Sequence, residues 1–150
     1  MRTLIKNRSA FKHFHPITTR WSDNDAYGHV NNVVYYSWFD TAVNQFLIVN
    51  HALDIEHGAL IGLVIETQCN YFSSFAFPDP VSVGICVGRL GNSSVRYEIA
   101  IFRANDDMAA VQGHFVHVYV DRTSRRPVPI PASMRELLQS IQGEPHDDKR

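Results

Sequence analysis

The sequence predicts an α+β fold, in which a long central helix is wrapped by a five- to six-stranded antiparallel sheet. From Tyr35 to Leu47 apolar residues recur every three or four positions, which is typical of an amphipathic helix buried along one side. The remainder of the chain consists mostly of β-branched and aromatic runs separated by hairpin-length turns. The residues of the helical stripe are Tyr35, Trp38, Phe39, Ala42, Val43, Phe46 and Leu47.

The expected strands follow from their composition and from the turn residues between them. Gly91-Asn92 indicates a hairpin turn, and Gly113, inside the last strand, indicates a bulge or a close approach of another backbone. After the sheet, residues 132–141 favour a short amphipathic helix. The strands are expected at residues 15–21, 61–72, 81–90, 95–103 and 108–121.

Length and composition predict a single globular domain over residues 1–150, with a frayed tail at 142–150. A net charge of −1 gives no global electrostatic argument for nucleic acid or an anionic membrane, and no apolar run approaches the ~20 residues of a membrane span. Cys69 and Cys86 lie in strand-like runs and are expected as buried thiols of a cytoplasmic protein. Residues 1–14 form a basic arm without an acid, which fits either a solvated arm or a targeting segment.

A polar loop precedes the helix and contains Asp23, Asn24, Asp25, Gly28 and His29. Asp and Asn at such positions cap backbone N–H groups, which is a sufficient structural reason for Asp23. A carboxylate beside a helix N-terminus can also act as nucleophile or general base where a developing oxyanion is stabilised. A metal site is less favoured, because the loop supplies few oxygen donors. The chain has no G-x-S-x-G motif, which disfavours a serine hydrolase, and no phosphate-binding glycine motif, which disfavours a nucleotide cofactor.

The segment WSDNDAYGHVNNVVYYSWFD, residues 21–40, resembles the 4-hydroxybenzoyl-CoA thioesterase family of hotdog-fold acyl-CoA thioesterases. Those proteins share a D-x-D-x-x-G-x-V pattern that leads into a long helix, and residues 117–131 resemble their closing strand. The resemblance implies hydrolysis of an acyl-CoA to the free acid and CoA, with no cofactor and no metal. Independently of the resemblance, a sheet with one face covered by the helix leaves its edges or other face available for a second subunit, so a homodimer or homotetramer is expected.

Carried over position by position, the resemblance makes Asp25 the catalytic carboxylate, as nucleophile or as activator of water. The N–H groups of Val30, Asn31 and Asn32 would polarise the thioester carbonyl. Tyr27, Gly28 and His29 would shape the substrate pocket, and Glu66 is a reserve base on the second strand. The expected CoA contacts are Arg89, Asn92, Ser93, Ser94 and Arg96.

Two alternatives remain open on the sequence. An acyl-carrier-protein thioesterase would need a basic docking surface, for which Arg89, Arg96 and Arg103 are candidates. A hotdog module that only binds acyl-CoA would retain Asp25 as a helix cap. A hotdog hydratase is disfavoured, because the loop lacks the D-x-N-P-x-H pattern of that branch.

Overall fold

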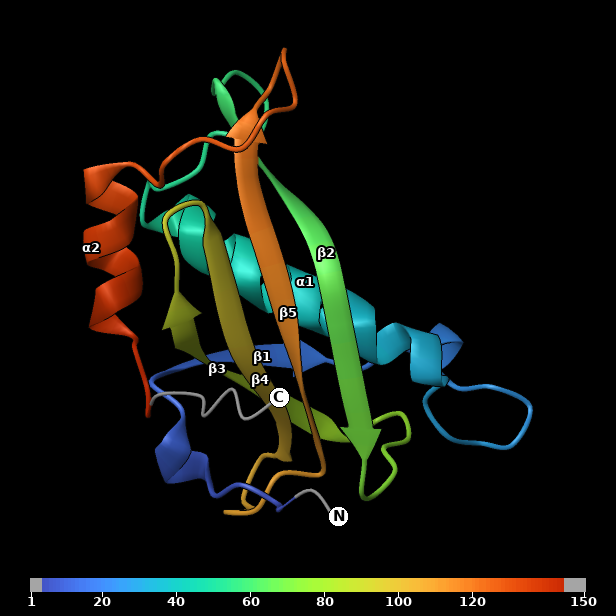
Figure 1. The fold of residues 1–150 in the computed structure, drawn as a ribbon. Helices are drawn as coiled ribbons and strands as arrows, with labels where there is room; N and C mark the ends of the chain where they lie inside the picture. The colour runs from blue at the N-terminus through green and yellow to red at the C-terminus, as the bar shows by residue number, and fades with distance from the viewer. Residues whose placement is uncertain (1–3, 145–150) are drawn as a thin grey trace.

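The computed structural model describes residues 4–144, and its layers are visible in Figure 1. A long helix, α1 (Asn32–Val49), lies across one face of a five-stranded antiparallel sheet, as the sequence predicts. The strands are β1 (His13–Thr18), β2 (Leu60–Tyr71), β3 (Pro80–Leu90), β4 (Ser94–Arg103) and β5 (Val111–Asp121), in the spatial order β1-β3-β4-β5-β2. The smaller elements are η1 (Arg8–Ala10), η2 (Trp21–Asp23) and α2 (Ala132–Ser140).

Helix α1 is amphipathic in the predicted register. Its seven buried residues are the seven members of the stripe that begins at Tyr35 and ends at Leu47. Burying each large apolar side chain stabilises the fold by about 1.5–3 kcal/mol, so this face fixes the helix on the sheet. Asn31 caps the helix, since its Oδ1 accepts a hydrogen bond from Val33 N at 3.0 Å.

The first strand is shorter than predicted, because it ends at Thr18 and not at residue 21. Residues 21–23 instead form the 3-10 helix η2, in which the Asp23 carboxylate accepts the backbone N–H of Arg20 at 2.7 Å. This local hydrogen bond competes with the strand ladder and folds the chain back. The sequence signal that was missed is therefore the Arg20–Asp23 spacing.

Gly113 marks a close approach of two backbones, one of the two alternatives that the sequence left open. A Cβ at this position would lie 1.9 Å from the carbonyl oxygen of Gln68 on β2. The sheet's irregularities lie elsewhere, at Val64/Glu66 between β2 and β5 and at Val87/Arg89 between β3 and β4.

The face of the sheet opposite α1, the outer face, carries a second and smaller apolar cluster. Residues 4–12, the N-terminal arm, lie against this face, and Phe11 packs edge-on against Phe102 with ring centroids 5.7 Å apart. Apolar contacts and backbone hydrogen bonds hold these residues on the sheet, although most of their side chains are exposed. Residues 1–3 lie outside the described part. The cluster consists of Phe11, Cys86, Ala100, Phe102 and Ala109.

The first residues of the predicted frayed tail, 142–150, are bound to the rest of the fold. The N–H of Gly143 donates to Val87 O at 2.9 Å, and Gln142 bridges to the same residue, so these two residues are held against β3. The remaining residues of the predicted tail, 145–150, lie outside the described part of the chain. Within residues 4–144, no helix is long and apolar enough to cross a membrane.

Strand β2 forms one edge of the sheet, coloured green in Figure 1. Leu63, Val64 and Ile65 are 37%, 49% and 63% exposed. An apolar edge strand with unpaired backbone groups is a surface that can pair with another strand.

Candidate active site

The loop before α1 is a tight turn built around Asp25. The N–H of Asp25 donates to His29 O at 2.8 Å, and the N–H of Gly28 donates to Asp25 O at 3.0 Å. Gly28 has a φ of +81°, which an L side chain rarely adopts, so glycine is required here. This closed turn holds Asp25 just before the helix.

The Asp25 carboxylate is engaged on one side only. Its Oδ1 accepts the backbone N–H of Tyr27 at 2.9 Å, and its other oxygen has no hydrogen-bond partner among residues 4–144. The side chain is half-buried. One oxygen is therefore oriented by the loop, and the other is free to react or to accept a proton.

Asp23 has a different, structural environment. Its side chain is fully buried, and Oδ1 accepts hydrogen bonds from Nε and Nη2 of Arg20 at 3.0 and 2.8 Å. Its backbone carbonyl accepts the N–H of Asn31 at 2.9 Å. Asp23 thus holds the two ends of the loop together, which agrees with the capping role that its position predicts.

The three N–H groups expected at the helix start are not equivalent. Val30 N donates to Phe75 O at 2.8 Å, and Asn31 N donates to Asp23 O. The N–H of Asn32 has no hydrogen-bond partner in the described part of the chain. Of the three, only this N–H is available to a ligand, and it is the first in α1, where the helix dipole favours negative charge.

A pocket of about 200 Å³ opens beside this N-terminus. It brings together the helix start, the last residue of β2 and the loop that follows β2. Burial raises the pKa of the Tyr35 hydroxyl in its wall, although the hydrogen bond that this hydroxyl accepts from Phe75 N opposes the shift. The pocket is lined by His29, Val30, Asn32, Tyr35, Tyr71, Phe72, Ser73 and Ser74.

Tyr71 is a residue of this pocket that the sequence reading missed. Its hydroxyl donates to the carbonyl oxygen of Asn32 at 3.1 Å, and its ring packs edge-on against Tyr35 at 5.2 Å. Burial, followed by a hydrogen bond with Cys69, raises the pKa of Tyr71 well above its usual value, so the hydroxyl stays protonated. The alternation of side chains along a strand puts Cys69 and Tyr71 on one face, and this pattern could have identified Tyr71 as a pocket residue from the sequence.

Arg103 fixes the opposite wall of the pocket. Its Nη1 donates to Ser73 Oγ at 2.9 Å, its Nη2 to the carbonyl of Ser74, and its guanidinium lies 4.7 Å from the centre of the Phe75 ring. From the sequence, Arg103 is a candidate for carrier-protein docking. In the structure it holds the loop whose Phe75 carbonyl binds Val30.

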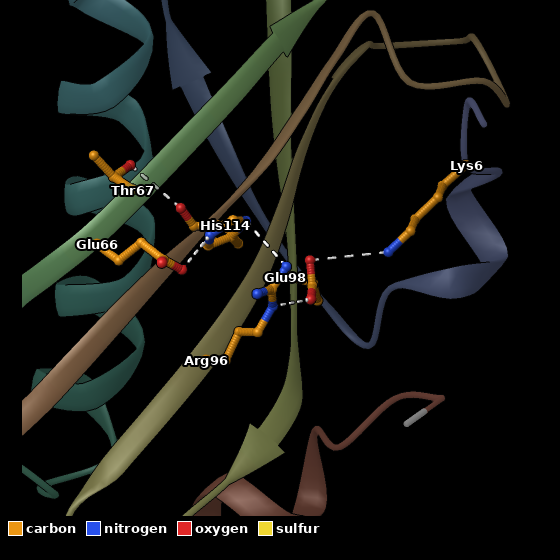
Figure 2. Close-up of polar contacts among 6 residues, drawn as sticks. All are labelled: Lys6, Glu66, Thr67, Arg96, Glu98 and His114. Atoms are coloured by element: carbon orange, nitrogen blue, oxygen red, sulfur yellow. Dashed lines mark hydrogen bonds and ion pairs between the residues drawn. The ribbon is translucent and has the colours of Figure 1, made fainter. Parts of the chain in front are cut away.

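Several predicted pocket residues lie apart from this pocket. Tyr27 is 89% exposed and does not line it. Glu66 lies on the outer face, as Figure 2 shows, where its Oε2 is 2.9 Å from Nε2 of His114. The bulge after Val64 sets this orientation, and the protomer does not bring Glu66 to Asp25.

The residues expected to contact CoA also lie away from the Asp25 loop. Arg96 belongs to the outer-face cluster of Figure 2, and Arg89 pairs with it in register. The hairpin of Asn92, Ser93 and Ser94 joins β3 and β4 at the end of the sheet that is remote from this loop (Figure 1). Its backbone is anchored, since Asn92 O accepts from Ile130 N and Ser93 O from Tyr119 N.

Residues 4–144 contain no group of three or more His, Cys, Asp or Glu side chains that could hold a metal ion. Asp23 is paired with Arg20 and does not converge with Asp25 and His29.

The part of the chain that contains this loop and helix matches a known protein family. Residues 19–138 match the model of the thioesterase-like superfamily, which is most of the chain. The chain belongs to this superfamily. A comparison with curated proteins gives no match.

Solved structures agree with this assignment. The PA5185 protein of Pseudomonas aeruginosa is 50% identical, with a TM-score of 0.92 over 95% of this chain and 100% of that one. The PA2801 protein of the same organism, named as a candidate thioesterase, is 31% identical, with a TM-score of 0.78 over 83% of this chain and 95% of that one. A Synechocystis 1,4-dihydroxy-2-naphthoyl-CoA thioesterase, 15% identical, shares the fold with a TM-score of 0.76 over 84% of this chain and 94% of that one.

These findings confirm the expected hotdog fold. They also support thioester hydrolysis as the general class of activity.

Proposed function

We propose that this protein is an acyl-CoA thioesterase in which Asp25 is the catalytic carboxylate. The observation that carries the proposal is the pairing of two unsatisfied groups in one short segment. One oxygen of Asp25 and the N–H of Asn32 both lack partners in the described chain, whereas the N–H groups of Val30 and Asn31 are hydrogen-bonded. A reactive carboxylate beside a free donor at a helix N-terminus suits attack on a polarised carbonyl.

In the proposed reaction the thioester carbonyl oxygen accepts the N–H of Asn32. As the carbon becomes tetrahedral, the developing negative charge is stabilised by that N–H and by the helix dipole. In one route Asp25 attacks the carbon, CoA leaves as thiolate, and water hydrolyses the resulting anhydride. In the other, Asp25 takes a proton from water, which attacks directly. Both routes yield the free acid and CoA and need no further group.

Tyr71 and Arg103 would support this reaction by holding the elements around the site in place. Tyr71 ties the end of β2 to the first peptide unit of α1, and Arg103 fixes the Ser73–Phe75 loop. Catalytic groups must be held by a rigid surrounding, because small displacements reduce the rate strongly.

We further propose a homodimer that pairs the β2 edges of two protomers. The edge is apolar and exposed at Leu63, Val64 and Ile65. Antiparallel pairing about a two-fold axis would place the partner's β3–β4 hairpin at the same end of the joint sheet as the Asp25 loop. The predicted CoA contacts would then serve the site of the other protomer.

The test is thiol release from a panel of thioesters with short, long, branched and aromatic acyl groups. Each acyl group is presented both on CoA and on an acyl carrier protein. Turnover of CoA esters that is lost in Asp25→Ala would support the proposal, whereas turnover of carrier esters alone would favour the carrier-protein alternative. Tight binding of CoA esters without any thiol release would contradict catalysis.

A further inference from the structure

The two edges of the sheet differ in their capacity to accept a further strand (Figure 1). Strand β1 has six residues, and its Pro16 has no backbone N–H to donate, whereas β2 has twelve residues and no proline. Short edge strands that contain proline disfavour pairing with another strand. β2 is therefore the edge at which the sheet can be extended.

The alternation of hydrogen bonds along β5 shows which residues of β2 face the free edge. The N–H of Tyr119 donates to Ser93 O, beside β4, and the N–H of Arg122 donates to Ala59 O, beside β2. Because successive residues of a strand bond opposite neighbours, odd-numbered residues of β5 bond β4 and even-numbered ones bond β2. In the observed register, the β2 residues whose backbone groups point to the free edge are Leu60, Gly62, Val64, Thr67, Cys69 and Tyr71.

A bulge interrupts this spacing at the centre of β2. Val64 pairs with His117, and Glu66 pairs with the adjacent residue of β5. Ile65 is thus an extra residue in the ladder, and the step from Val64 to Thr67 is three residues, whereas the other edge-facing residues are two apart. A regular strand has a step of two throughout and would lose its pairing here. A second copy of β2 that runs antiparallel carries the same three-residue step at its own centre.

We propose that two copies of this protein pair their β2 strands about a two-fold axis that passes between Ile65 and Glu66. Val64 of one protomer then stands opposite the partner's Thr67, and every edge-facing residue meets an edge-facing residue. A shift of one residue would set edge-facing residues against residues that already bond β5. A shift of two would set Val64 against Ile65, or Thr67 against Glu66. This inference rests on the proposed β2 dimer and defines its register.

The directions of the side chains agree with this register. Val64 and Thr67 stand opposite His117 and Phe115 of β5. Phe115 belongs to the core beneath α1, and the His117 ring stacks on it, so Val64 and Thr67 both face the α1 side. Residues that stand opposite each other in a sheet must share a face, and here they do so on both sides of the bulge.

The register also places a residue of the partner at the Asp25 pocket. Tyr71 lines that pocket, and the residue opposite it is the partner's Leu60. The Leu60 side chain packs partly against the core on the α1 side, which is the face that carries the pocket. Opposite side chains have Cβ atoms about 5 Å apart, so the partner's Leu60 gives the pocket an apolar wall beside Tyr71. The acyl group is thus enclosed by both protomers.

The register is tested by disulfide formation in Leu63→Cys/Gln68→Cys, whose two new thiols stand opposite each other across the axis. Their Cα atoms would be about 4.5 Å apart, within reach of a disulfide. Leu63→Cys/Asn70→Cys is the matched control, because its new thiols are diagonal neighbours about 7–8 Å apart. Both are made in a Cys69→Ala background, and light scattering under reducing conditions gives their mass. On mild oxidation, we expect most chains of the first variant and few of the control to be crosslinked.

A second measurement needs no substitution. In wild-type dimers refolded from a mixture of ¹³C-methyl-labelled and unlabelled chains, isotope-filtered spectra should show contacts between Leu60 methyl groups and the partner's Tyr71 ring. Absence of these contacts in a dimer, or crosslinking as strong in the control as in Leu63→Cys/Gln68→Cys, would overturn the register and leave the thioesterase proposal untouched. A monomeric wild type would overturn the register and the dimer together, whereas a lack of thioesterase activity would bear on neither.

Discussion

The hydroxyl of Tyr71, at the end of β2, donates a hydrogen bond to the carbonyl oxygen of Asn32, the first residue of α1, at 3.1 Å. This bond joins the edge strand to the helix N-terminus beside the Asp25 loop. It also links the exposed edge, where we propose dimerisation, to Asn32. Of the three N–H groups predicted for the site, that of Asn32 is the one without a partner among the described residues.

Replacing Tyr71 with phenylalanine removes this bond and keeps the ring on Tyr35. We expect the free energy of unfolding to fall by about 1 kcal/mol, and kcat to fall more than KM changes, because the helix start is less well fixed. Chemical denaturation and steady-state kinetics measure the two effects. Ser140→Ala, which removes a hydroxyl-to-carbonyl hydrogen bond at the exposed C-terminal end of α2, is the control and should change neither. An unaltered kcat in Tyr71→Phe would contradict the positioning role.

The stability of the protein should respond differently when the charge of Asp23 or of Asp25 is removed. Asp23→Asn is expected to lower the free energy of unfolding by about 2 kcal/mol, because the buried carboxylate accepts three hydrogen bonds from Arg20. Asp25→Asn should leave stability nearly unchanged, since the side chain accepts one hydrogen bond among the described residues, from Tyr27 N in a half-exposed turn. Parallel denaturation curves test this contrast, and a larger loss in Asp25→Asn would show that the two roles are reversed.

How far sequence could lead is visible in these two aspartates. The stripe from Tyr35 to Leu47 predicted the buried face of α1 completely, because a helix of that length has one apolar side and only one way to bury it. The loop pattern located both acids but did not show which of the two carboxylates Arg20 would bind.

Other residues could not be assigned because their positions depend on the whole sheet. Glu66 and Arg96 were predicted near the substrate, yet both lie on the outer face, since a bulge at Val64/Glu66 and the β4 register decide their orientation. Tyr71 was overlooked because its contact with Asn32 joins residues 39 positions apart. Local patterns carry no information on such pairings.

His117 should make stability depend on pH. Burial among aromatic side chains lowers the pKa of His117 from 6.5 to about 4, although the charge of Asp40 opposes this shift, and its Nε2 has no partner among the described residues. The unfolded chain therefore binds the proton more readily, so the free energy of unfolding is highest above pH 6.5 and falls as the pH drops to about 4. The difference between the two pKa values corresponds to about 3 kcal/mol.

Unfolding measured at several pH values in wild type and in His117→Gln checks this contribution. The variant should lose the part of the slope between pH 4 and 6.5 that His117 contributes, whatever its absolute stability. His57→Gln, at an exposed position, should retain the slope. Equal slopes in wild type and His117→Gln would contradict the assignment.

The proposed β2 interface can be tested by placing a charge on the edge. Ile65→Lys should convert the dimer to monomers, because the lysine side chain would be desolvated at the joint. Light scattering coupled to size exclusion measures the mass, with Ile55→Lys as control, since Ile55 is also exposed but lies outside the sheet. Unchanged assembly in Ile65→Lys would place any interface elsewhere.

The most direct test of the account is the rate of thiol release by Asp25→Asn with the best acyl-CoA substrate found for wild type. We expect a fall in kcat of about 10²–10⁴-fold, with the fold and the affinity for the CoA ester retained, because only the proton-accepting or attacking oxygen is lost. A folded variant that keeps the wild-type rate would contradict Asp25 as the catalytic carboxylate.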